Sequence, residues 1–114
     1  MADIKTIITQ RAARFLKDGD VVNLGIGMPE MVANFLPEDV HVVFQAENGI
    51  MGMGAVATDE NEDVNVSNAG GKYVTTIPGA MFFDSSFSFG LIRGGHVDAT
   101  ILGCLQVDQE GSPE

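Results

Sequence analysis

One stretch of the sequence combines a carboxylate with the glycine-rich backbone that covalent or acid–base chemistry requires. It runs from Gln45 to Gly54 and follows the run His41–Phe44, which predicts a short buried strand. Glu47 therefore leaves the end of a strand and enters a turn that glycines keep free of side chains. Ligands bind at the carboxyl ends of strands in open α/β sheets. A glutamate there could act as a nucleophile, a general base or a ligand clamp.

The same residues also fit a purely structural role. Asn48-Gly49 is a strong hairpin signal, and short patterns of strand plus turn are ambiguous. From spacing alone, the functional and the structural interpretations both stay open.

A second pair of glycines, Gly25 and Gly27, follows the apolar run Val21–Leu24. A strand, a Gly-x-Gly turn and a helix start can place backbone amides against an anion. Glu30 stands where a dinucleotide-binding fingerprint has its third glycine, and no P-loop lysine follows. The pattern therefore argues against a nucleotide cofactor and, taken alone, favours a tight turn.

Composition narrows the class of protein and the kinds of partner. With 114 residues, 45% hydrophobic and 19% charged, the chain predicts at most one small globular domain. A net charge of −10 argues against nucleic acid and anionic membranes as partners. The single Cys104 excludes a disulfide within the chain, and two distant histidines offer no metal-ligand pattern. No apolar run reaches spanning length and no signal peptide is recognisable, which predicts a soluble, cytoplasmic protein.

The hydrophobic pattern predicts an α/β fold, an open sheet with helices on both faces. Helices are expected over about 4–17, 30–36 and 84–92, and strands over 21–24, 41–46, 73–77 and 97–105. The first helix is amphipathic, and the stripe expected to be buried comprises Ile4, Ile7, Ile8, Ala12, Phe15 and Leu16. Pro78-Gly79 is expected to end a strand, and Cys104 to be a buried thiol. Met51 and Met53 are expected to pack beneath the central turn.

Three further features allow more than one interpretation. The acidic run 59–63 is expected to be a solvated loop, or the surface of an excursion that covers the site. The phenylalanines at 82, 83, 87 and 89 are expected in the core, although two of them could line an apolar pocket. Arg93 is expected to pair with a carboxylate, or else to grip an anionic substrate.

Four blocks of the sequence, in order, resemble the beta subunit of the family I CoA-transferases. The block around Glu47 resembles their Ser-Glu-Asn-Gly active-site signature, with Ala46 in place of the serine. The other blocks are Asn23–Pro29, Ile77–Ala80 with Phe83–Ser85, and Ile92–Asp98. The likeness extends from about Thr6 to Gly111 and suggests an acetoacetate/butyrate-type 3-oxoacid CoA-transferase.

The resemblance implies a role for each candidate residue. Glu47 would be the covalent nucleophile that carries CoA as a glutamyl thioester between an acyl-CoA and a short-chain carboxylic or 3-oxo acid. Gly25, Gly27, Asn48 and Gly49 would contribute to substrate binding. CoA would be a substrate, with no metal and no other cofactor. The partner would be a CoA-transferase alpha subunit in a hetero-oligomer.

The resemblance also implies that residues 1–114 are the N-terminal part of a single beta-subunit domain of the CoA-transferase (isomerase-like) fold, incomplete at the C-terminus. Family members place a second oxyanion-hole glycine in the part beyond. One alternative is a catalytically inactive truncated or assembly subunit of the same fold. Another is a sugar-phosphate isomerase that uses Glu47 as a base.

Overall fold

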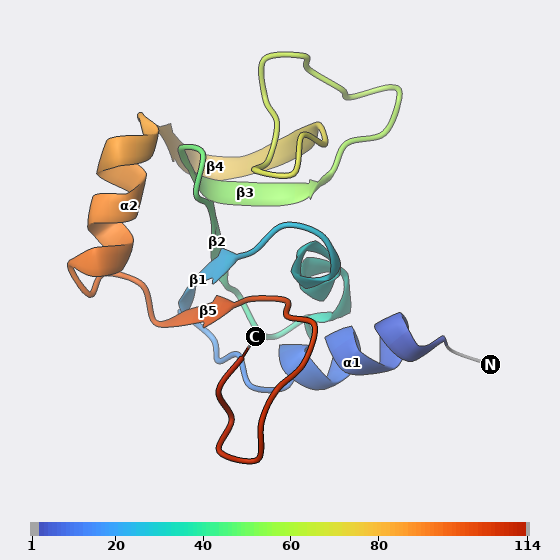
Figure 1. Ribbon diagram of the computed structural model, residues 1–114. Helices are drawn as coiled ribbons and strands as arrows, with labels where there is room; N and C mark the ends of the chain where they lie inside the picture. The colour runs from blue at the N-terminus through green and yellow to red at the C-terminus, as the bar shows by residue number, and fades with distance from the viewer. Residues whose placement is uncertain (1–2, 114) are drawn as a thin grey trace.

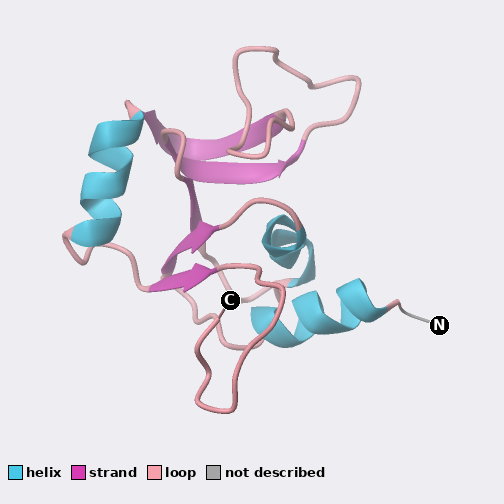
Figure 2. Ribbon diagram, viewed as in Figure 1, coloured by secondary structure: helices cyan, strands magenta, loops and turns pink. Residues whose placement is uncertain are grey.

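The computed structural model describes residues 3–113 and shows an open five-stranded sheet with helices on both faces (Figures 1 and 2). The α/β class predicted from the sequence is confirmed. In chain order the elements are α1 (Ile4–Ala13), β1 (Val21–Leu24), the 3-10 helix η1 (Met28–Phe35), β2 (Val43–Ala46), β3 (Ile50–Val56), β4 (Val74–Phe82), α2 (Ser85–Arg93) and β5 (Ala99–Ile101).

The order of strands brings three loops to one edge of the sheet. The order is β4-β3-β2-β1-β5, and β1 runs parallel to both β2 and β5. β3 is antiparallel to β2 and to β4. Parallel strands end at the same edge, so the segments that follow β1, β2 and β5 emerge together. These segments begin at Gly25, Glu47 and Leu102.

The core lies between the sheet and the layer formed by α1 and η1, while α2 stands on the opposite face (Figure 1). Val22 of β1 and Val32 of η1 are both fully buried. The other buried apolar side chains are Ala13, Leu16, Leu24, Phe44, Ala46, Ile50, Met53 and Val74.

The first helix is shorter than predicted and buries a different face. α1 ends at Ala13, and its N-cap Asp3 accepts a hydrogen bond from the Thr6 amide at 2.8 Å. Thr9, Ala13 and Leu16 are buried. Most of the predicted stripe is exposed, namely Ile4, Ile7, Ile8 and Phe15, so that prediction is wrong. The helix packs chiefly against η1.

The strands β3 and β4 depart from the sequence prediction. The sequence does not predict β3, because its glycines interrupt the alternation of apolar and polar residues that identifies a strand. In the structure, two register shifts interrupt the pairing of β3 with β4. Met51 and Met53 lie within this strand. β4 continues through Pro78-Gly79, which was expected to end it. β4 is an edge strand, where a proline with no amide N–H is tolerated.

Helix α2 is confirmed, but its aromatic surroundings are not a core. The Asp84 side chain caps the helix by accepting a hydrogen bond from the Phe87 amide at 2.7 Å. Phe82, Phe87 and Phe89 are exposed, and Phe83 packs on Phe87 with ring centres 5.1 Å apart. Ser88 is the buried residue of this helix. The helix therefore faces the sheet with the polar side chain of Ser88, while most of its aromatic side chains stay exposed.

The last strand is three residues long instead of the nine predicted, and Cys104 is exposed instead of buried. The chain leaves β5 after Ile101 and turns back, and Val107 bridges to Pro113. The apolar pattern of 97–105 therefore predicts a longer strand than the one that forms, because only its centre pairs with β1.

Asp18 and His41 join the loops that precede β1 and β2. The His41 amide donates to Asp18 Oδ1 at 2.7 Å, and the His41 ring Nδ1 lies 3.0 Å from the same oxygen. The Gly19 amide donates to the His41 carbonyl at 2.7 Å. His41 is thus a structural residue just before its strand. The backbone amide of His41, followed by its ring, lowers the pKa of the Asp18 carboxyl below 3.8.

This lowered pKa predicts an acid-dependent stabilisation. A depressed carboxyl pKa in the folded state stabilises the fold above the unfolded pKa, and the effect is lost as the pH falls through the folded value. Asp18→Ala should therefore lower the melting temperature at pH 6, and the gap to wild type should narrow below pH 3.8. Scanning calorimetry of both proteins tests this, with Asp59→Ala in the exposed loop as the control. A gap that does not change with pH would contradict the assignment.

Candidate functional site

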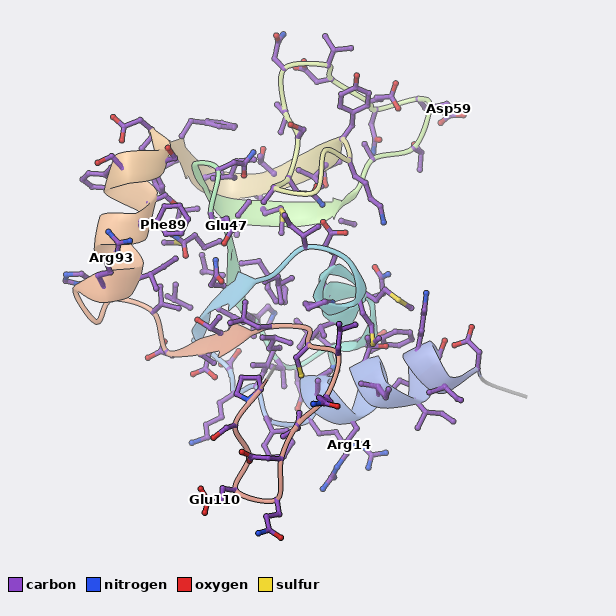
Figure 3. The ribbon with its side chains drawn as sticks, in the orientation of Figure 1. Arg14, Glu47, Asp59, Phe89, Arg93 and Glu110 are labelled. Carbon is purple, nitrogen blue, oxygen red and sulfur yellow. The ribbon has the colours of Figure 1, made fainter. Side chains whose placement is uncertain are left out.

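Glu47 lies in the hairpin turn that joins β2 to β3 (Figure 3). Ala46 pairs with Ile50, so the turn consists of Glu47, Asn48 and Gly49. The Gly49 amide donates to the Ala46 carbonyl at 3.0 Å. The hairpin and the strand-end interpretations are therefore compatible, because the turn begins where β2 ends beside the parallel β1. Glu47 is half-buried.

Glycine suits position 49 because a side chain there would collide with the backbone that directly follows β4. Its φ is +131°, in the region that favours glycine. A Cβ at this position would overlap the carbonyl oxygen of Phe83. The Phe83 amide in turn donates to the Gly49 carbonyl at 2.9 Å. The turn is thus held against the chain that leaves β4.

A buried polar network supports the strand that ends at Glu47. Gln45 is fully buried, and its Nε2 donates to the carbonyl of Ser88 at 3.0 Å and to Ser88 Oγ at 2.9 Å. Asn23 Nδ2 of β1 donates to Gln45 Oε1 at 3.4 Å. Ser88 Oγ approaches the Ala46 carbonyl at 3.5 Å. β1, β2 and α2 are therefore joined directly beneath the turn.

Sequence reasoning missed this network. Gln45 belongs to the central glycine-rich stretch, but the motif assigns no role to it or to Ser88. A glutamine within an apolar strand was the available signal, because a buried amide requires partners. The identity of those partners depends on the packing of α2, which lies 43 positions along the chain from Gln45.

The Asn48 side chain forms a hydrogen bond with the excursion between β3 and β4, residues 57–73. Its Nδ2 donates to the Ser67 carbonyl at 2.8 Å. In the same excursion Lys72 Nζ lies 3.5 Å from Glu30 Oε2, and Gly70 leaves no room for a side chain beside Glu30. The excursion therefore touches both the Glu47 turn and the start of η1. Its acidic run 59–63 is exposed, which confirms the prediction of a solvated loop.

Gly25 and Gly27 play different parts at the neighbouring strand end. The Gly25 amide donates to the Ile101 carbonyl at 2.8 Å, and a Cβ there would press on Leu102. Gly25 thus allows β1 and β5 to approach closely. Gly27 has a φ of +92°, is exposed, and would meet no atom with an added Cβ. Its backbone is open to a ligand at the same sheet edge as Glu47.

Positive charge is concentrated away from Glu47. Lys5, Arg11, Arg14 and Lys17 all lie on α1 or directly after it, and Figure 3 shows Arg14 beside α1, well away from Glu47. The Arg93 guanidinium lies over the Phe89 ring, 5.7 Å from its centre. Among residues 3–113 it forms no ion pair with a carboxylate, which corrects that prediction. The chain itself thus offers little positive charge to an anionic ligand beside Glu47.

No helix within residues 3–113 combines the length and the apolar character needed to cross a membrane.

The chain is similar in sequence to subunits of several enzymes that are named as CoA-transferases. The chain is 54% identical over 110 residues to the beta subunit of the Escherichia coli acetate CoA-transferase, a match that covers 96% of this chain and 50% of that protein. It is 46% identical over 111 residues to one subunit of the probable succinyl-CoA:3-ketoacid coenzyme A transferase of Bacillus subtilis, covering 97% of this chain and 51% of that protein.

A human relative, succinyl-CoA:3-ketoacid coenzyme A transferase 2, mitochondrial, is 44% identical over 109 residues, which cover 96% of this chain and 21% of that protein. The chain thus spans about half the length of the bacterial relatives it matches. Residues 5–112 match the family described as Coenzyme A transferase. The chain therefore belongs to the coenzyme A transferase family.

Proposed function

We propose that this chain serves in the transfer of CoA between an acyl-CoA and a short-chain carboxylic or 3-oxo acid, with Glu47 as the covalent nucleophile. The observation that carries the proposal is the position of Glu47. It stands at the carboxyl end of a strand, in a glycine turn that a buried network supports. The relatives named for acetate and for succinyl-CoA:3-ketoacid transfer support the class of acid.

The proposed reaction exchanges one thioester for another. The Glu47 carboxylate attacks the thioester carbonyl of the acyl-CoA, and a mixed anhydride forms as the CoA thiolate leaves. The thiolate then attacks the glutamyl carbonyl, which gives a glutamyl-CoA thioester and releases the first carboxylate. The acceptor carboxylate repeats the steps in reverse and leaves as the new acyl-CoA. No redox equivalent is consumed, and no metal or other cofactor takes part.

The described residues suit several requirements of this chemistry. The backbone at Gly27, where an added Cβ would meet no atom, leaves room for a substrate at this sheet edge, and Gly49 lets the Glu47 turn pack against Phe83. Asn48 holds the excursion beside the turn through Ser67. Gly25 keeps β5 close to the Gly27 loop. These contacts support the four residues as parts of the substrate site.

The charge of the chain supports the need for a partner. CoA is polyanionic, the chain has a net charge of −10, and four of its six Lys and Arg residues lie on or just after α1. We propose that an alpha subunit supplies cations and the rest of the pocket in a cytoplasmic hetero-oligomer. We further propose that this chain corresponds to the N-terminal part of its own subunit.

A second candidate function is that of an inactive assembly subunit of the same fold. An inactive assembly subunit would keep the fold and the hairpin while lacking the groups that the longer relatives contribute. It would bind the alpha subunit without forming a covalent intermediate.

Intact-mass spectrometry separates the two functions. The chain, mixed with the alpha subunit of a related CoA-transferase and acetoacetyl-CoA, should gain the mass of CoA less water, and hydroxylamine should remove the gain. Glu47→Ala should abolish the adduct, whereas Glu110→Ala, at a distant exposed carboxylate, should keep it. A full-length relative that forms the adduct while this chain does not would count against the transfer function for residues 1–114. An adduct in Glu47→Ala would place the nucleophile elsewhere.

A further inference from the structure

Asn48 is the one asparagine in the sequence that a glycine follows. In an Asn-Gly pair the backbone nitrogen of the glycine can attack the side-chain amide carbon of the asparagine, because the glycine carries no side chain that hinders the approach. The nitrogen gives up its proton, ammonia leaves, and a cyclic succinimide forms. Water then opens the ring at either carbonyl, which leaves aspartate or isoaspartate at position 48. Water is the only co-reactant, so the pair is a candidate for spontaneous modification.

Two hydrogen bonds of the folded turn engage the groups that this reaction requires. Asn48 is exposed, but its Nδ2 donates to the Ser67 carbonyl at 2.8 Å. The attacking nitrogen belongs to the buried Gly49, and its N–H donates to the Ala46 carbonyl at 3.0 Å. Both bonds must open before the ring can close. The folded chain should therefore react more slowly than the unfolded chain, by the free energy of this local opening.

A second turn, within the excursion between β3 and β4, holds the Ser67 carbonyl in place. Asn68 is buried, and its Oδ1 accepts hydrogen bonds from the amides of Gly70 and Lys72, both at 3.0 Å. The Asn68 amide in turn donates to the Lys72 carbonyl at 2.8 Å. The acceptor for Asn48 is thus fixed by a residue that does not itself take part in the reaction.

The product of this reaction cannot keep the contact with Ser67. A carboxylate only accepts hydrogen bonds, so its oxygens would face the Ser67 carbonyl oxygen with no proton between them. We propose that Asn48 is a site of spontaneous deamidation, that its hydrogen bond to Ser67 slows the reaction, and that the product releases the excursion from the Glu47 turn. The modification itself does not depend on CoA transfer. Only one consequence rests on the proposed function, namely that a second negative charge beside Glu47 should weaken the binding of an anionic substrate.

Peptide mapping by mass spectrometry tests the proposal without substrate. The chain is incubated in mildly alkaline buffer, once folded and once unfolded in guanidinium chloride, and samples are taken over time. Cleavage after glutamate releases residues 48–60, or 39–60 where the bond after Glu47 is missed, and Asn48 is the only asparagine in either peptide. Unfolding should speed the gain in mass at Asn48 about 30-fold, which corresponds to the opening of two hydrogen bonds of ordinary strength. Asn34, which phenylalanine follows in the peptide 31–38, should stay unmodified in both samples.

Two matched asparagine variants separate the effect of the fold from the intrinsic reactivity of Asn48. Asn68→Ala removes the side chain that orders the turn at Ser67, and should speed the reaction in the folded chain about fivefold or more. Asn61→Ala also removes a side chain that accepts two hydrogen bonds, both from Thr58, and should stay within about twofold of wild type. All three proteins should react at one rate in guanidinium chloride. The wild-type comparison of folded and unfolded chain holds even if Asn68→Ala does not fold.

Hydrogen exchange measures the consequence for the excursion. Asn48→Asp reproduces one product of the reaction, and deuterium uptake in residues 63–73 should rise about fivefold or more. The rise should exceed that in Asn48→Ala, which loses the donor but adds no charge. Unchanged uptake in Asn48→Asp, equal rates in the folded and unfolded wild-type chain, or no reaction at Asn48 in the unfolded chain would each overturn the proposal. Because none of these measurements involves CoA, a chain that fails to form the glutamyl adduct leaves this test unaffected.

Discussion

Gly49→Ala is expected to lower the free energy of unfolding by about 3 kcal/mol or more. The φ of +131° costs a residue with a Cβ about 1–2 kcal/mol. The added Cβ also overlaps the Phe83 carbonyl oxygen. That oxygen has little freedom to move, because the Phe83 amide donates to Gly49 and the adjacent Phe82 pairs with Ile50. Overpacking of this kind lowers the free energy of unfolding by about 1–3 kcal/mol more.

Urea unfolding of the two proteins measures this loss. Gly19→Ala is the matched control, because Gly19 has a φ of +89° but an added Cβ there meets no atom within 4 Å. It should show the backbone cost alone, about 1–2 kcal/mol. If the two variants lose the same stability, the turn does not press on Phe83. A larger loss in Gly49→Ala shows that the Glu47 turn and the end of β4 form one unit.

The comparison of Gly49 with its sequence context shows how far the hairpin could be predicted. Asn48-Gly49 indicates a turn from local propensity, and the structure confirms it. The close approach of Phe83 lies 34 positions further along the chain and leaves no local signal. The same limit hid β3, because Gly52 and Gly54 break the alternation that identifies a strand.

Periodicity predicts an amphipathic helix but does not identify what covers it. The spacing in 4–16 predicts buried isoleucines, whereas the helix buries Thr9 and Ala13. The hydroxyl of Thr9 is satisfied inside the helix by the Lys5 carbonyl at 2.8 Å, so its burial needs no external partner. Burial on this face therefore follows from the contact with η1, which the spacing of apolar residues does not specify.

For the candidate site, too, the sequence predicts the local features but not the contacts between distant elements. Glu47 at a strand end follows from one local run of residues, and the glycines at 25 and 27 follow from another. Their placement at one sheet edge depends on β1 pairing in parallel with β2, a non-local fact that the spacing of residues does not reveal. The network beneath Glu47 required a third element, α2, and so remained outside any local pattern.

The second large effect is expected from Gln45→Met. The substitution keeps the length of the side chain but removes its contacts with Asn23 and Ser88. Asn23 is 2% exposed and Ser88 fully buried, so their freed polar groups cannot turn to water. A buried group left without its partner costs about 1–3 kcal/mol. Gln45→Met should therefore lower the free energy of unfolding by about 2 kcal/mol.

A double-mutant cycle with Ser88→Ala tests the network directly. If Gln45 and Ser88 act through each other, the double variant should lose about 1 kcal/mol less than the sum of the single losses in urea unfolding. Val32→Ala, also fully buried but apolar, is the control and should add to Gln45→Met without coupling. Additive losses of Gln45→Met and Ser88→Ala would show that the contact is incidental. Coupling would show that α2 holds the end of β2, and with it the position from which Glu47 leaves the sheet.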